Sequence, residues 1–279
     1  MAIVLALSSA LSYGTSDFLA GLASRRFASE LITFAAQVLG AITAGVAIIF
    51  FPGSGPTGSA LAWGAVSGIG SALGVLALYH GLAVARMTVV ATLCAVLTTI
   101  IPVIVGVTLG NHLGIVAVAG IAIAVPAIGL VSWQPDQKDA SAARAGPLYG
   151  VLAGLGFALL FIALDRAGTH AGAWPLLPGQ LVSLLLIAPF AYRALRKAEW
   201  PSRTTVLQTL GTGTLSGAAN LLFLAATASG QLAIVAVLTS LYPAFTVLLA
   251  RVVLSERWTR PQAAGLLTAV TAIILVSTG

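Results

Sequence analysis

The chain has 279 residues, of which 59% are hydrophobic and only 7% charged, and its mean hydropathy is +1.05. A soluble domain carries about 25% charged residues, so this composition excludes a soluble globular protein. Continuous apolar runs of about 20 residues instead predict helices that span a lipid bilayer. A transmembrane β-barrel would need runs of about 10 residues in which apolar and polar residues alternate, and that pattern is not seen.

Lys and Arg outnumber Asp and Glu by 13 to 7. In a soluble protein this excess would suggest a nucleic-acid partner. Here the basic residues fall in short loops between apolar runs, so we expect no nucleic-acid partner and interpret them as topology signals. The single cysteine, Cys94, rules out a disulfide within the chain. The N-terminus lacks the basic residues of a signal peptide, which predicts a retained first helix.

In chain order, the apolar runs predict ten spanning helices joined by short connections rich in Gly and Pro. The longest connection, 133–146, is polar and separates a first unit, 1–132, from a second, 147–279. The predicted segments are 2–22, 30–51, 60–83, 87–108, 111–132, 147–165, 174–192, 205–228, 232–250 and 261–278.

The two units repeat one another. A shift of 145 positions (265 − 120) aligns Met87–Ser132 with Leu232–Ser277 without a gap, and with a small change of register Asp17 falls on Asp165. Each unit holds five helices, an odd number, so tandem copies must cross the membrane in opposite senses. The sequence therefore predicts an all-α integral membrane protein of ten transmembrane helices, arranged as two inverted five-helix repeats.

The basic residues predict an orientation independently. Loops after the odd-numbered segments hold 12 of the 13 Lys and Arg residues, and only Arg166 follows an even-numbered segment. By the positive-inside rule, the odd loops face the cytoplasm and both termini lie outside, which for a bacterial inner-membrane protein is the periplasm.

Segment eight carries polar residues at lipid depth, where such side chains usually face a cavity. Thr209, Ser216, Asn220 and Thr227 are spaced by 7, 4 and 7 positions and so share one helical face. This face could offer hydrogen-bonding groups to a polar solute. Alternatively, its Ser and Thr residues hold neighbouring helices together, whereas Asn220 has more polar atoms to satisfy.

Segment one places Tyr13 and Asp17 on one polar face, and Asp17 is the best candidate for proton coupling. The alternative is that Asp17, near the end of its segment, reaches Arg25, Arg26 and water. Gln37 in segment two is a weaker cavity candidate, as is its counterpart Gln180 in segment seven.

Tyr79 and His80 lie near the end of segment three. Both could line a cavity, and His80 could also take part in proton coupling, because histidine exchanges a proton near neutral pH. The alternative is a pair of amphipathic rings at the membrane interface.

Two prolines are expected to kink helices. Pro243 removes a hydrogen bond within segment nine, and Pro102 does the same in segment four. Carbonyls freed by a kink could bind solute, although such kinks are also common in membrane helices. The polar residues beside the two prolines that we expect in the cavity are Thr98, Thr99, Ser240 and Tyr242.

Signatures of soluble enzymes are missing from the sequence. It has no Walker loop, no HExxH motif and no grouping of its three histidines, so we expect no direct ATP use, no metal and no cofactor. An intramembrane protease or acyltransferase would need paired catalytic residues at one depth. Asp17 and Asp165 should instead lie toward opposite membrane faces, so we expect no enzyme.

The stretch Leu238–Leu267, LTSLYPAFTVLLARVVLSERWTRPQAAGLL, resembles the EamA group of the drug/metabolite transporter superfamily. The first copy departs from this pattern, with Asn111 in place of Glu256 and Thr98 in place of Pro243. The resemblance implies a ten-helix secondary transporter with a central cavity between its halves. Members export amino acids and other metabolites, and the general look is that of amino acid exporters of the YddG type.

We therefore expect a monomeric inner-membrane exporter of small polar metabolites, with amino acids first, that works by alternating access. Its partners would be its small-molecule substrate and the lipid bilayer. The scarcity of buried charge favours a net-neutral, zwitterionic solute. The rival hypotheses are a proton-coupled multidrug or other metabolite exporter, which would need a membrane-embedded carboxylate, and a passive channel.

Overall fold

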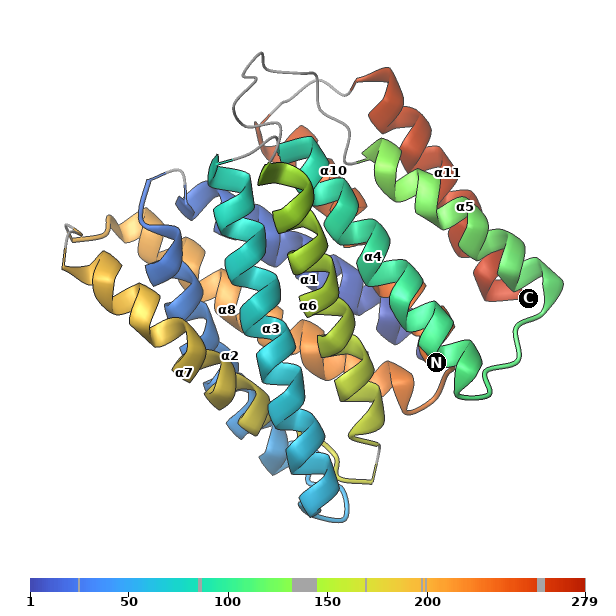
Figure 1. Ribbon diagram of the computed structural model, residues 1–279, viewed down its shortest axis with the longest axis horizontal. Coiled ribbons are helices and arrows are strands. Elements are labelled where there is room, and N and C mark those ends of the chain that lie inside the picture. Colours follow the sequence, from blue (N-terminus) through green and yellow to red (C-terminus); the bar gives the residue numbers. More distant parts are fainter. Residues whose placement is uncertain are drawn as a thin grey trace.

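The computed structural model describes residues 1–24, 26–84, 87–131, 145–168, 170–196, 198, 200–254 and 259–278, and the regular structure in these ranges is entirely helical (Figure 1). The helices are α1 (Ala2–Ser24), α2 (Ser29–Phe50), α3 (Gly58–Val84), α4 (Met87–Thr108), α5 (Ile115–Val131), α6 (Ala145–Arg166), α7 (Leu176–Leu195), α8 (Arg203–Thr227), α9 (Leu232–Thr239), α10 (Tyr242–Leu254) and α11 (Arg260–Thr278). The predicted linker, 133–146, falls almost wholly outside the described residues, as does Glu256 of the predicted hinge.

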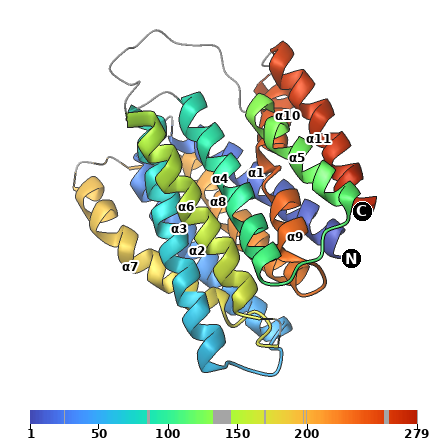
Figure 2. The same ribbon diagram turned by 45° about the vertical axis from the view of Figure 1, so that its right-hand side comes forward.

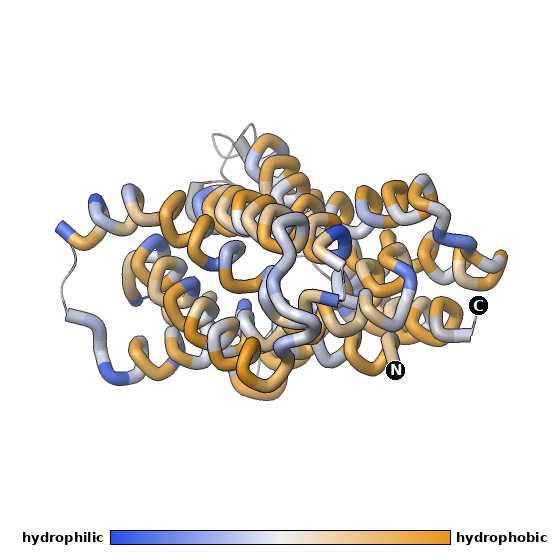
Figure 3. The backbone as a smooth tube through the Cα atoms, turned by 90° about the horizontal axis from the view of Figure 1, so that it is seen from below, coloured by the Kyte–Doolittle hydropathy of each residue, from blue (hydrophilic) through white to orange (hydrophobic). Residues whose placement is uncertain are grey.

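The outside of the bundle is apolar and its interior is built from small residues. Ile49, Leu185 and Val252 are each more than 70% exposed, with values of 74%, 73% and 71%. The buried set is instead dominated by Ala, with Ser and Thr among it. Figure 3 shows hydrophobic residues along most of the length of the helices. This distribution suits lipid, where helices associate by the close approach of small residues rather than by hiding apolar surface from water.

Six helices are long and apolar enough to cross a membrane, by length and composition. One of the six, Leu232–Ala250, combines α9 with most of α10, and the apolar helices in α4, α5 and α11 are shorter. Helix α8 is long enough, with 25 residues, but its Thr, Ser, Asn and Gln residues lower its hydropathy. The chain is thus a multi-pass membrane protein.

The helices pack mainly on partners from the other half of the chain. Helix α3 packs on α6 and α7, α1 packs on α8 and α10, and α5 packs on α11. Helix α2 contacts both α7 and α8, and α4 contacts both α6 and α9. Figures 1 and 2 show α5 and α11 side by side at one edge of the molecule and α7 at the opposite edge.

Some of these contacts depend on glycine. A Cβ on Gly14 of α1 would lie 2.5 Å from the Tyr242 carbonyl oxygen at the start of α10, so this crossing needs a residue without a side chain. Two repeat-related glycines behave alike: Gly68 of α3 lies against the backbone of Gly179 in α7, and Gly213 of α8 lies against Ala36 in α2. Small residues therefore set the helix separation in both halves.

The segments that contain the two predicted kinks differ. The second copy is interrupted between Thr239 and Tyr242, where α9 ends and α10 begins, and Pro243 is the second residue of α10. Proline fits the first turn of a helix because its missing N–H would have no partner there. Helix α4 of the first copy instead runs without a break through Pro102.

The loops at one end of the bundle are joined by hydrogen bonds. We call this the clamped end; it is where α2, α4, α6 and α8 end, and both termini lie there (Figure 1). The Ser54 N–H donates to the His170 carbonyl over 2.7 Å, and the Ala173 N–H donates to the Phe51 carbonyl over 2.9 Å. The opposite end is where α1, α3, α5, α7 and α10 end.

A second pair of loops meets at the clamped end. The Asn111 Oδ1 accepts a hydrogen bond of 3.2 Å from the Ala233 N–H at the start of α9. The Gln231 side chain donates to the His112 carbonyl over 3.1 Å. Each pair therefore joins one loop of the first half to one loop of the second.

Candidate functional site

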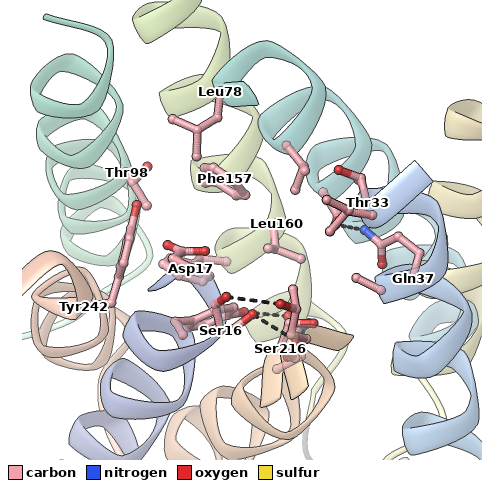
Figure 4. Close-up of a pocket in the computed structure, with 18 residues that line it drawn as sticks. Ser16, Asp17, Thr33, Gln37, Leu78, Thr98, Phe157, Leu160, Ser216 and Tyr242 are labelled. Atoms are coloured by element: carbon pink, nitrogen blue, oxygen red, sulfur yellow. Dashed lines mark hydrogen bonds between the residues drawn. The ribbon is translucent and has the colours of Figure 1, made fainter. Parts of the chain in front are cut away.

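A cavity lies where α1, α2, α3, α4, α6, α8 and α10 meet, and it offers about 80 Å³ to the centres of water molecules (Figure 4). A single water needs about 10–15 Å³ by this measure, so a small solute group fits with several waters. The residues that line it are Tyr13, Ser16, Asp17, Ile32, Thr33, Ala36, Gln37, Ser71, Val75, Leu78, Thr98, Phe157, Leu160, Phe161, Thr212, Ser216, Asn220 and Tyr242.

One wall of the cavity is fixed by hydrogen bonds between α1 and α8. The Tyr13 hydroxyl donates to the Asn220 Oδ1 over 2.7 Å, and the Asn220 amide donates to the Ser216 carbonyl over 3.1 Å. One turn away, the Ser16 hydroxyl donates to the Thr212 carbonyl over 2.9 Å. Because these bonds link residues about 200 positions apart, they hold the two halves together at the cavity.

The rest of the lining combines polar and aromatic groups. The Gln37 amide of α2 donates to the Ser71 hydroxyl of α3 over 3.1 Å. The Tyr13 ring lies between the rings of Phe161 and Tyr242, with centroids 6.2 Å away in each case. Aromatic rings at this separation give the cavity firm, largely apolar sides.

Asp17 contributes a carboxylate to the cavity, and Figure 4 shows it between Tyr242 and Ser16. Among the described residues, no cation pairs with this carboxylate and no cation lines the cavity. The alternative contact with Arg25 falls on a residue outside the described ranges.

The repeat-related Asp165 is placed differently. It lies in the last turn of α6 and does not line the cavity. Its neighbour Arg166 holds its guanidinium over the Trp63 ring, 5.7 Å from the centroid. The two carboxylates therefore occupy equivalent positions in sequence but different environments.

A smaller cavity adjoins the first one. Ser71, Leu160 and Asn220 line both cavities, and Gln180 of α7 lines the smaller one together with Ser67. The Gln180 Oε1 is buried without a hydrogen-bond partner among the described residues. The repeat-related glutamines, Gln37 and Gln180, thus both reach this polar region.

The structure brings seven of the predicted cavity residues together: Tyr13, Asp17, Gln37, Thr98, Ser216, Asn220 and Tyr242.

Four other predicted residues lie outside the cavity. The hydroxyls of Thr99 and Thr227 donate to carbonyls of their own helices, those of Ala95 and Leu224. Ser240 is fully buried at the break between α9 and α10, and His80 is exposed, with its ring 5.0 Å from that of Tyr149. The side chain of Tyr79, which was also predicted, falls outside the described residues.

Several cavity residues were not predicted. The face chosen on α8 ran from Thr209 to Thr227, but the cavity reaches only the middle of that helix and also takes in Thr212. Thr33 and Ser71 were missed as well. Gln37, which hydrogen-bonds to Ser71, was the signal that could have found α2 and α3. Among the described residues, no group of three or more His, Cys, Asp or Glu side chains could hold a metal.

Comparison with known proteins gives a family match in the second half of the chain. Residues 144–278 match the EamA-like transporter family. A solved structure described as "Crystal structure of protein" aligns with a TM-score of 0.78 at 18% identity, over 99% of this chain and 96% of that chain, and so shares its fold. No curated protein matches the chain. The second half of this membrane protein is therefore similar to the EamA-like transporter family, and nearly the whole chain shares its fold with a solved structure.

Proposed function

We propose that the chain is a secondary transporter that exports small metabolites, first of all amino acids, across a bacterial inner membrane by alternating access. The observation that carries this proposal is a cavity with polar groups in its wall, built from membrane-type helices of both halves. Polar groups are costly inside a membrane and usually mark a solute pathway. An EamA-like domain in residues 144–278 agrees with this function.

The proposal includes ten membrane crossings in two inverted five-helix repeats. Support comes from the helix contacts, which map onto themselves when the halves are exchanged: α3 with α6 becomes α8 with α1, and α3 with α7 becomes α8 with α2. Three contacts remain the same contacts when the halves are exchanged: α2 with α7, α4 with α9 and α5 with α11. A two-fold axis that relates the halves would produce this pattern, and in an inverted repeat that axis lies in the membrane plane.

Alternating access is supported by the position of the α1 and α2 residues of the cavity along their helices. Its residues on α2, from Ile32 to Gln37, lie near the helix start, and those on α1, from Tyr13 to Asp17, lie in the second half of that helix. Both positions are nearer the opposite end than the clamped end. The hydrogen-bonded loops lie at the other end of the bundle.

Amino acids fit the mixture of neutral polar groups, aromatic sides and small size. A sugar phosphate fits poorly, because an anion of that charge calls for Lys or Arg and none among the described residues lines the cavity. Both termini would lie in the periplasm, as the distribution of basic residues indicates.

The test is counterflow into proteoliposomes that contain the purified protein and unlabelled solute. We expect uptake of labelled threonine, methionine or phenylalanine to exceed that of empty vesicles and to saturate. Uptake that never exceeds the empty vesicles would rule out amino acids. Flux that rises without saturation would indicate a passive channel.

A second candidate is a proton-coupled exporter of organic cations, and one observation favours it: Asp17 places a carboxylate in the cavity wall. An imposed pH gradient should then drive transport of a lipophilic cation, and Asp17→Asn should abolish this coupling. Unchanged pH-driven transport in the variant would remove Asp17 from the mechanism.

A further inference from the structure

The hydroxyl groups in the cavity wall offer a ligand mainly hydrogen-bond acceptors rather than donors. Eight of its lining residues carry a hydroxyl group, and six of these hydroxyls donate their hydrogen to another protein group. A hydroxyl that has donated its hydrogen offers only lone pairs to a ligand. The six are Tyr13, Ser16, Thr33, Thr98, Thr212 and Ser216.

The carboxylate in the cavity also favours a ligand that donates hydrogen bonds or carries a positive charge. Asp17 supplies a carboxylate that accepts no hydrogen bond from any described residue, and no described cation lines the cavity. Besides the Ser71 hydroxyl, which accepts from Gln37, the remaining donors include neutral amide hydrogens, because the amides of Asn220 and Gln37 each donate only one hydrogen to the described residues. A negatively charged ligand would therefore meet a like charge and no cation to offset it.

The aromatic rings add to this preference. Tyr13, Phe157, Phe161 and Tyr242 all line the cavity, and their faces carry negative electrostatic potential. A cation over an aromatic face is stabilised by this potential, more strongly when water is excluded. Lone pairs, a carboxylate and ring faces thus surround one space.

We propose that this cavity is an ammonium site, in which Asp17 binds the amino group of the solute and the hydroxyl lone pairs accept its N–H donors. The inference rests on the proposed function and, among small metabolites, moves the preferred substrate from free amino acids to amino compounds without a free carboxylate. The amino group is the part of the solute that the cavity recognises, and a carboxylate on the same solute weakens binding. Primary amines, amino acid amides and amino acid esters therefore bind better than the parent zwitterions.

The test compares ligands that share one carbon frame, by thermal shift and by competition in direct binding to the purified protein. The series is phenylalanine, phenylalanine amide, phenethylamine and 3-phenylpropionate. We expect the amide and phenethylamine to bind at least about tenfold more tightly than phenylalanine, because each lacks the charge that Asp17 repels. We expect no binding of 3-phenylpropionate.

The matched variants are Asp17→Asn and Asp165→Asn, since the second carboxylate lies outside the cavity. Loss of a charge-assisted hydrogen bond should weaken amine binding about tenfold or more in Asp17→Asn and leave it unchanged in Asp165→Asn. The ligand series on the unmodified protein does not depend on the folding of either variant.

Three results would overturn the ammonium site: binding of 3-phenylpropionate as tight as that of phenethylamine, equal amine binding by Asp17→Asn, or no binding by any amine of the series. Amine binding without counterflow would keep the site and contradict the transporter. Counterflow of solutes regardless of their amino group would keep the transporter and contradict the site.

Discussion

The two ends of the helix bundle differ in how their loops are connected. At the clamped end, Ser54 bonds to His170 and Asn111 bonds to Ala233, so loops of the two halves are held together. At the opposite end, the hydrogen bonds of the described loop residues are local, such as those from Arg26 to Ala23 and from Ala198 to Leu195. Among the described residues, loops of the two halves are therefore joined to each other at the clamped end only.

This difference connects the fold to the proposed function. The α1 and α2 residues of the cavity lie nearer the opposite end, and the clamp joins loops of the two halves at the other end. In a transporter with inverted repeats, the alternative state arises when the two halves exchange conformations. Opening of the clamped end should therefore be required in each transport cycle, and the following predictions alter the clamp from the largest expected effect to the smallest.

A disulfide across the clamp should abolish transport. In a Cys94→Ala background, Ser54→Cys and His170→Cys place two cysteines at residues already joined by a backbone hydrogen bond. Disulfides need Cα atoms about 4.4–6.8 Å apart, which such a contact provides. We expect counterflow to fall more than about tenfold on oxidation and to return with reductant, while the two single-cysteine variants keep their activity. Full activity in the cross-linked protein would show that the clamp need not open.

Gly53→Ala should destabilise the clamp strongly. Gly53 has φ +55°, and its Cβ would meet the His170 carbonyl oxygen, so the change combines backbone strain with a clash. We expect a loss of about 2–3 kcal/mol of stability, seen as a lower Tm in detergent. The matched control is Gly55→Ala in the same loop, where φ is +95° but the Cβ meets nothing within 4 Å, and the loss should be smaller. Equal Tm values for the two variants would contradict the packing described for the clamp.

Asn111→Ala should have a moderate effect. It removes the acceptor for the Ala233 N–H at the start of α9, a bond worth about 1 kcal/mol. We expect the balance between the two states to shift about fivefold, measured as a change in the solute concentration that half-saturates counterflow. Asn111→Asp retains the acceptor oxygen next to a helix N-terminus and should restore the original value.

Gln231→Ala should have the smallest effect. The Gln231 side chain donates to the His112 carbonyl at an exposed position, where water can replace the bond. We expect a change in stability within about 0.5 kcal/mol and nearly unchanged counterflow. A loss as large as that of Asn111→Ala would show that this bond is shielded from water.

The sequence predicted the helical membrane architecture because continuous apolar runs have few other interpretations. It predicted cavity residues less well, because in lipid the outer face of a helix is apolar too and gives no strong amphipathic pattern. Asp17 shows the problem: by position it lies near a segment end, but α1 continues to Ser24 and packs on α8 and α10, which turns Asp17 into the cavity.

Polar residues that lie outside the cavity show the same limit of prediction from the sequence. Thr99 and Thr227 satisfy their hydroxyls on carbonyls of their own helices, a local solution that costs nothing in lipid. His80 lies near the end of α3, where an exposed ring is tolerated. Which polar residue faces a cavity depends on the neighbours of its helix, and single-sequence periodicity does not contain that information.

The most direct test of a one-sided cavity is the reactivity of a thiol placed in it. Ser71→Cys in the Cys94→Ala background puts a small thiol in the cavity wall, and an impermeant thiol reagent can be applied to either face of oriented vesicles. With the engineered disulfide between positions 54 and 170 formed, we predict labelling only from the opposite end. When this disulfide is reduced, the transport cycle should expose the thiol to both ends. Labelling of the cross-linked protein from the clamped end would contradict the alternating-access account.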